Sequence, residues 1–117
     1  MNKNTFLIAL FTLFFAINVI AQTSPKREFR GVWIATVANI DFPSSSKLDS
    51  ETQKKEWIEL MENLKAAGMN AVVAQIRPAG DAFYPSELVP WSKYLTGKQG
   101  SSPVPFYDPL AFMIEET

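Results

Sequence analysis

Two runs of apolar residues along the chain have the composition of strands. β-Branched and aromatic residues crowd the stretch Val32–Val37, and this composition predicts a first strand over about residues 30–38. A second apolar run covers residues 71–76 and is interrupted only by Gln75. Such a run indicates a strand over residues 70–77 that is covered on both faces, as in a parallel sheet.

Between these two runs, apolar residues recur with helical spacing. The positions on one face are Trp57, Leu60, Met61, Leu64 and Ala67. Ser50 as N-cap, Gln53 as its capping-box partner and Gly68 as a left-handed terminator set the limits of this helix. We expect the apolar face to pack in the core rather than against a partner helix, and the strand, helix and strand to form a right-handed crossover with parallel strands.

The proline-rich stretch 78–107 lacks a periodic pattern. Loops of this length are functional or disordered, and this one is too aromatic for ordinary disorder, with Phe83, Tyr84, Trp91, Tyr94, Phe106 and Tyr107. Asp108 as N-cap and Pro109 at the first helical position then predict a final helix. Its inward-facing stripe is expected to begin with Leu110, Met113 and Ile114.

The amino-terminal residues have the pattern of an export signal. Lys3 precedes an apolar stretch over residues 6–20, and small residues lead up to Ala21. We therefore expect a signal peptide over 1–21, cleavage after Ala21, a polar tail over 22–28 and an exported mature protein in the periplasm, the cell envelope or outside the cell. The alternative is an uncleaved membrane anchor, but the run is shorter than the roughly 20 residues needed to cross a bilayer.

Composition excludes several classes of function. The chain has 11 Lys and Arg against 12 Asp and Glu, so it offers no basic surface for nucleic acid. It contains no Cys and no His, which removes disulfides and the usual zinc sites. We expect no metal, no cofactor, no nucleic-acid partner and no stable membrane insertion after cleavage.

Candidate chemistry begins directly after the second strand. Arg77 precedes Pro78, so its guanidinium should emerge at the carboxyl end of the strand, where it could clamp a carboxylate or sugar hydroxyls. The alternative is an ion pair with Asp81 that orders the loop. Gln75 either hydrogen-bonds inside a barrel or reaches the site as an amide ligand.

Two carboxylates and several aromatic rings complete the candidate set. Asp41 and Asp81 would face the same rim, and paired carboxylates are what glycoside hydrolysis requires, although Asp at a strand end also serves to fix a loop. Trp91, supported by Tyr84 and Tyr94, could stack on pyranose rings, or these rings could simply pack the loop. Trp33 within the first strand is expected in the core.

Four segments together resemble the amino-terminal part of the glycosyl hydrolase-like 10 family of bacterial exported proteins: REFRGVWIATVANIDFP, LKAAGMNAVVAQIRPAGDAFYPS, VPWSKYLTGKQG and YDPLAFMIEE. The likeness extends from Glu28 to Glu116. It implies a (β/α)₈ glycosidase-like barrel, a carbohydrate substrate and action on a bacterial envelope or other glycan, with peptidoglycan as one candidate. Gln75, Arg77, Asp81 and Trp91 match the family pattern and are the expected substrate-binding residues, with Asp81 and Asp41 as catalytic candidates.

A complete (β/α)₈ barrel takes about 250 residues. We therefore expect an α/β fold in which residues 29–117 form the first two β/α units of a truncated TIM barrel, inactive alone because further catalytic groups would lie on later strands. The alternatives are a non-catalytic glycan-binding or envelope interaction protein on the same scaffold, and a short secreted protein that pairs its open sheet edges with another chain.

Overall fold

The computed structural model describes residues 2–3 and 28–117. In chain order the elements are β1 (Gly31–Ile34), the 3-10 turn η1 (Val37–Asn39), α2 (Ser50–Ala66), β2 (Ala71–Ala74), α3 (Lys93–Thr96) and α4 (Pro109–Glu115). Apart from residues 2–3, the predicted signal peptide lies outside the described residues, as does the predicted tail up to residue 27. Among the described residues, no helix is both long enough and apolar enough to cross a membrane.

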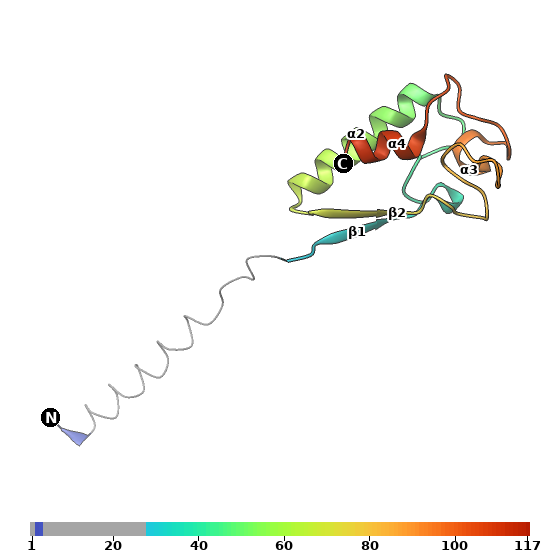
Figure 1. Ribbon diagram of the computed structural model, residues 1–117. Coiled ribbons are helices and arrows are strands. Elements are labelled where there is room, and N and C mark those ends of the chain that lie inside the picture. The colour runs from blue at the N-terminus through green and yellow to red at the C-terminus, as the bar shows by residue number, and fades with distance from the viewer. Residues whose placement is uncertain (1, 4–27) are drawn as a thin grey trace.

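The fold is a small α/β arrangement built on one parallel strand pair. β1 and β2 pair in register from Gly31 opposite Ala71 to Ile34 opposite Ala74. The helix α2 connects them, and α2 and α4 lie on the same side of the sheet (Figure 1). The predicted order of strand, helix and parallel strand is confirmed.

The first strand is shorter than predicted. It was expected over residues 30–38, but its pairing with β2 stops at Ile34. Beyond Ile34 a side chain, and not the backbone of β2, accepts hydrogen bonds from the backbone. The Gln75 Oε1 atom accepts hydrogen bonds from the backbone N–H groups of Thr36 and Val37, at 3.1 and 3.0 Å. β2 is shorter than its expected range too, since a ladder cannot extend beyond its partner.

The ends of α2 match the sequence signals to within one residue. The N-cap is Asp49, whose carboxylate accepts from the Thr52 N–H at 2.8 Å, so the predicted cap Ser50 is the first helical residue. At the other end Gly68 has a φ of 83°, as a left-handed terminator requires. The N–H of Met69 bonds the carbonyl of Leu64 at 2.9 Å, and that of Gly68 bonds Lys65 at 3.0 Å. These two bonds form a Schellman motif.

The core lies between the sheet and the helices. Its buried members are Ile34, Phe42, Trp57, Phe83, Leu95 and Met113. Trp57 is the centre of the predicted inner face of α2, and Phe42 meets it edge to face at a centroid distance of 5.1 Å. On α4 the expected inward residue Ile114 is instead 71% exposed, because Pro109 and Met113 occupy the buried side.

The second face of the sheet is open within the described part of the chain. Trp33 on β1 is 58% exposed and its register partner Val73 on β2 is 45% exposed. The predictions that Trp33 lies in the core and that β2 is covered on both faces are therefore wrong for these residues. The physical reason is that α2 and α4 cover the opposite face.

Candidate active site

The residues predicted to bind substrate follow the carboxyl ends of the two strands. We define the carboxyl rim as residues 35–41, which follow β1, and residues 75–107, which follow β2. Figure 1 shows both segments and α3 beyond the arrowheads of the strands. Ligand sites of parallel α/β proteins occur at this end of the sheet.

Gln75 joins the two segments of the rim. Its side-chain oxygen holds the N–H groups of Thr36 and Val37, and its backbone carbonyl accepts the Thr36 hydroxyl. The sequence left two roles open for Gln75, internal hydrogen bonding and ligand binding. The side-chain oxygen serves internal hydrogen bonding. Across residues 28–117 the amide nitrogen donates to no protein acceptor, so it is the part of the side chain that can serve a ligand.

Asp81 is fully buried within the loop after β2. One carboxylate oxygen, Oδ1, accepts from the Ala79 N–H at 3.1 Å. The other, Oδ2, has no hydrogen-bond partner among the described residues. A buried carboxyl oxygen without a hydrogen-bond partner is costly, so this oxygen is free to accept from a donor outside residues 28–117.

Arg77 and Asp81 do not form the ion pair that was the alternative to a ligand clamp. No ion pair within residues 28–117 involves Arg77, and its side chain is exposed. The guanidinium therefore keeps its planar set of donors for a group outside this part of the chain.

Asp41 and Asp81 have separate local roles in the described residues. The Asp41 Oδ2 atom accepts from the Ala35 N–H at 2.8 Å and thereby closes the turn after β1. The sequence predicts that these two carboxylates face the same rim. Both residues do follow the ends of strands, but Asp41 is exposed and Asp81 is buried. Within the described residues, no hydrogen bond links the two carboxylates.

Trp91 is fixed beside the loop that carries Asp81. Its neighbour Ser92 donates its N–H to the carbonyl of Ala82 at 2.9 Å, and the Trp91 carbonyl accepts from Gly100 at 2.9 Å. The indole is half-buried against the core and meets the exposed ring of Phe106 edge to face, with a centroid distance of 6.2 Å. One part of the indole thus stays accessible at the rim.

The two tyrosines proposed to support Trp91 are both half-buried. The backbone carbonyl of Tyr94 accepts from the Asn39 amide at 2.7 Å, which ties α3 to the loop after β1. The Lys93 ammonium lies 5.1 Å from the centroid of the Tyr94 ring. Tyr84 follows the buried Phe83 on the segment after Asp81.

A buried polar network beneath the rim was not predicted. The Gln53 amide nitrogen donates to the carbonyls of Leu48 and Leu95, at 3.0 and 2.9 Å, and its oxygen accepts from the Tyr107 hydroxyl at 2.8 Å. Burial, and secondarily the charge of Glu51, raise the pKa of Tyr107 above its usual value, so it remains a donor. The network joins α2, α3 and the end of the long loop.

Sequence reasoning overlooked Gln53 as a network residue because its position also suited a capping box. The signal that could have found it is a polar residue four positions before Trp57 on the inner face of the helix. Phe106 was counted only as one of the loop aromatics. Among the described residues, no group of three acidic side chains has the arrangement of a metal site.

A family comparison decides the relationship of this chain. The profile described as glycosyl hydrolase-like 10 matches residues 28–117, a range that includes every element from β1 to α4. The chain belongs to the glycosyl hydrolase-like 10 family. The resemblance found in four sequence segments is thereby confirmed.

This member of the glycosyl hydrolase-like 10 family is similar to two curated bacterial proteins. It is 54% identical over 114 residues to the glycosyl hydrolase YngK of Bacillus subtilis (strain 168), a match that covers 96% of this chain and 22% of the relative. It is 38% identical over 98 residues to the glycosyl hydrolase DigH of Escherichia coli (strain K12), covering 78% of this chain and 22% of that relative. The chain spans about a fifth of the length of these relatives.

The first residues of the family match lie beside the amino end of β2. The Asn70 amide donates to the carbonyl of Glu28 at 2.6 Å, and its oxygen accepts from the Arg30 N–H at 2.8 Å. This side chain therefore fastens the start of the glycosyl hydrolase-like 10 segment to the amino end of β2. The carboxyl rim lies at the other end of the same strand.

Proposed function

We propose that the protein to which this chain belongs is a glycoside hydrolase. The observation that carries the proposal is the match of a glycosyl hydrolase-like family to every residue from 28 to 117. Two similar bacterial proteins named glycosyl hydrolases support it. The expected reaction is hydrolysis of an O-glycosyl bond by paired carboxylates, at least one of which would come from strands that follow in the longer protein.

The proposed architecture is a TIM barrel in which β1 and β2 are the first two strands. The parallel pairing supports this, as does the sheet face on which Trp33 and Val73 are exposed, because such a barrel would bury that face in its interior. A barrel also needs a third strand beside β2, which within the described residues pairs only with β1.

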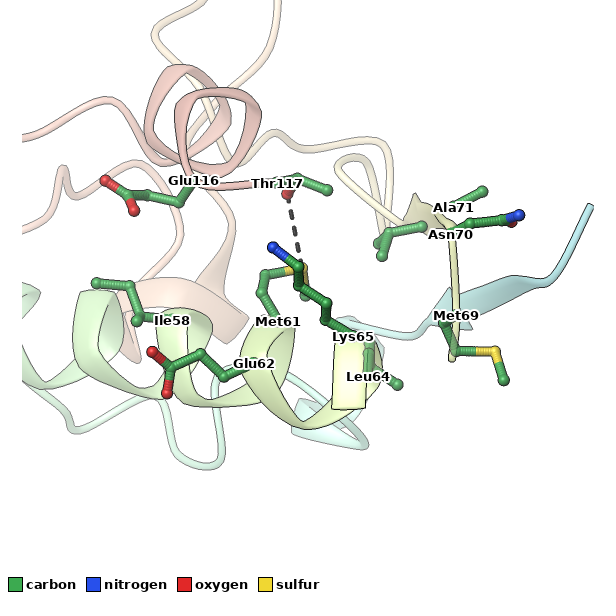
Figure 2. A pocket seen from close by; sticks show the side chains of 11 residues that line it. Ile58, Met61, Glu62, Leu64, Lys65, Met69, Asn70, Ala71, Glu116 and Thr117 are labelled. Carbon is green, nitrogen blue, oxygen red and sulfur yellow. Dashed lines mark hydrogen bonds between the residues drawn. The ribbon is translucent and has the colours of Figure 1, made fainter. Parts of the chain in front are cut away.

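A cavity of about 500 Å³ lies at the amino end of β2 and supports the same architecture. Figure 2 shows its wall of side chains from α2 and β2, with Thr117 next to Met61 across the opening. Its lining includes Leu64, Met69 and Val72. A third parallel strand that followed α4 would start at this end of the sheet, where these apolar side chains could pack against it.

At the carboxyl rim, we assign glycan binding to Arg77, Trp91 and the amide nitrogen of Gln75. The exposed guanidinium can donate to sugar hydroxyls or to a carboxylate, and the accessible part of the indole can pack on a pyranose face. Asp81 is a candidate for organising the site, since its unpaired Oδ2 can receive a donor from a neighbouring strand. The proposal assigns no metal and no cofactor.

The proposed substrate is a glycan of the bacterial envelope, with peptidoglycan as the first candidate. The signal-like sequence over residues 1–21 supports export to the compartment where this polymer lies. A balance of 11 basic and 12 acidic residues supports a carbohydrate partner rather than a nucleic acid.

The test is a hydrolysis assay on the complete protein that carries this sequence. Peptide-free glycan strands of peptidoglycan, chitin oligosaccharides, cellulose oligosaccharides and starch oligosaccharides are incubated separately, and new reducing ends are counted. Release from at least one glycan, lost in a variant lacking the acidic pair of the later strands, supports the proposal. Absence of cleavage of all four overturns it.

A second candidate is a non-catalytic glycan-binding protein on the same scaffold. The observation that favours it is that Asp41 is bonded to the turn after β1 and Asp81 is buried, so these two carboxylates are not accessible together as a catalytic pair within the described residues. The same glycans distinguish the two candidates. A binder would retain one of them in a pull-down or calorimetric assay and release no reducing ends.

A further inference from the structure

An exposed aromatic ring stands beside Trp91 at the rim. Phe106 is 65% exposed, and its ring plane makes an angle of 88° with the indole plane at a centroid distance of 6.2 Å. The two rings therefore form an L-shaped apolar corner. A single exposed apolar residue is ordinary on a protein surface, but the residues on both sides of this ring are anchored.

The residues on both sides of Phe106 are anchored to the core. The carbonyl of Pro105 accepts the hydroxyl of Ser50, the first residue of α2. On the other side, the hydroxyl of Tyr107 donates to the buried Gln53 at 2.8 Å. Within residues 28–117, Phe106 is thus exposed between two anchored neighbours.

The second ring of the corner is fixed in the same way. The strand-like bridge between Ala82 and Trp91, and the bond from Gly100 to the Trp91 carbonyl, hold the indole against the core. A corner whose two walls are both held in place costs little ordering entropy when a ligand binds. Such preorganised apolar walls with polar groups nearby are typical of small-molecule sites.

We propose that Trp91 and Phe106 together form a sugar-binding subsite, in which one ring packs on the apolar face of a pyranose and the other contacts its edge. The inference rests on the proposed function and extends it to Phe106, a residue outside the family-matched site residues named from the sequence. Two perpendicular aromatic rings suit a pyranose, which has axial C–H groups on its face and hydroxyls around its edge. The hydroxyls on the rest of the edge then point away from the corner, toward water and the polar rim.

The experiment measures glycan affinity by calorimetry with the complete protein and peptide-free peptidoglycan strands as the probe. Phe106→Ala is expected to raise Kd on the order of tenfold, because it removes one aromatic wall. Phe106→Tyr retains the ring and is expected to stay within about twofold of the unchanged protein. The matched control is Leu88→Ala on the same loop, since Leu88 is 94% exposed and is expected to leave Kd unchanged.

Thermal unfolding of each variant separates binding from packing. If Phe106→Ala leaves Kd unchanged, or if Phe106→Tyr loses as much affinity as Phe106→Ala, the subsite is wrong while hydrolysis by the unchanged protein still upholds the proposed function. A fall in the unfolding temperature of Phe106→Ala with no loss of affinity means that the ring packs against another part of the protein. If the unchanged protein neither binds nor cleaves any of the four glycans, both proposals fail together.

Discussion

Replacing Gln75 by leucine is expected to lower the free energy of unfolding by about 2 kcal/mol. The change keeps the approximate size of the side chain and removes the oxygen that holds the N–H groups of Thr36 and Val37. A neutral hydrogen bond contributes about 0.5–1.5 kcal/mol net, so two contribute about 1–3 kcal/mol. Thr36 is fully buried and Val37 is half-buried, so water can solvate only the second donor in part, which places the loss near the middle of this range.

The assay is equilibrium urea denaturation of the complete protein, followed by tryptophan fluorescence. Trp57 is 1% exposed and therefore reports directly on opening of the core. Gln99→Leu makes the same chemical change at an exposed position and is the control. Gln75→Glu keeps an acceptor oxygen at the same site, so it is expected to lose less stability than Gln75→Leu.

A loss below about 0.5 kcal/mol for Gln75→Leu, equal to that of Gln99→Leu, would refute the reasoning, since changes of that size are usual for surface substitutions without a specific role. It would mean that the turn after β1 does not depend on the side-chain oxygen. A loss equal in Gln75→Leu and Gln75→Glu would refute it in another way, because the acceptor would then not be what matters.

Three further predictions test the core and the helix ends. Tyr107→Phe leaves the Gln53 oxygen buried without a donor and is expected to cost about 1–3 kcal/mol by urea denaturation. Trp57→Ala empties the centre of the core and is expected to cost about 3–5 kcal/mol in the same assay. The bond from Thr52 holds the pKa of Asp49 below its usual 3.8, so this carboxylate stabilises the fold above that value and the contribution is lost as pH falls through the lowered pKa. Asp49→Ala is therefore expected to be less stable than the unchanged protein at pH 7, and the difference is expected to shrink as pH falls below 3.8, as thermal melts across pH will show.

The features that sequence predicted are those with local causes. The left-handed Gly68 and the Asp108 cap, whose carboxylate accepts from the Ala111 N–H at 3.1 Å, depend on residues within one or two turns. The shift of the first cap from Ser50 to Asp49 shows the limit of such signals, because adjacent residues can both cap and only the path of the entering chain selects one. The single turn α3 escaped detection because four residues carry no periodicity, although Ser92 and Gly97 mark its ends.

The features that sequence could not predict depend on contacts between distant segments. Gln75 ends β1 from a position 39 residues further along the chain. The burial of Asp81 and the bond between Tyr107 and Gln53 likewise need the folded loop. Because Arg77, Asp81 and Trp91 follow β2 in the chain, their place beyond the end of this strand could be predicted. The burial and hydrogen-bond partners of each side chain could not, because they depend on contacts with distant segments.

The reach of Gln75 across the strand pair makes the end of β1 a joint property of two segments. Family members that exchanged the loop over residues 35–41 alone would separate the backbone donors of that loop from the acceptor that fixes them. A segment transferred between family members without breaking these bonds would therefore run from before β1 to beyond residue 75 and include α2. Within that unit, the loop after β1 can vary in sequence as long as two N–H groups still meet the amide of Gln75.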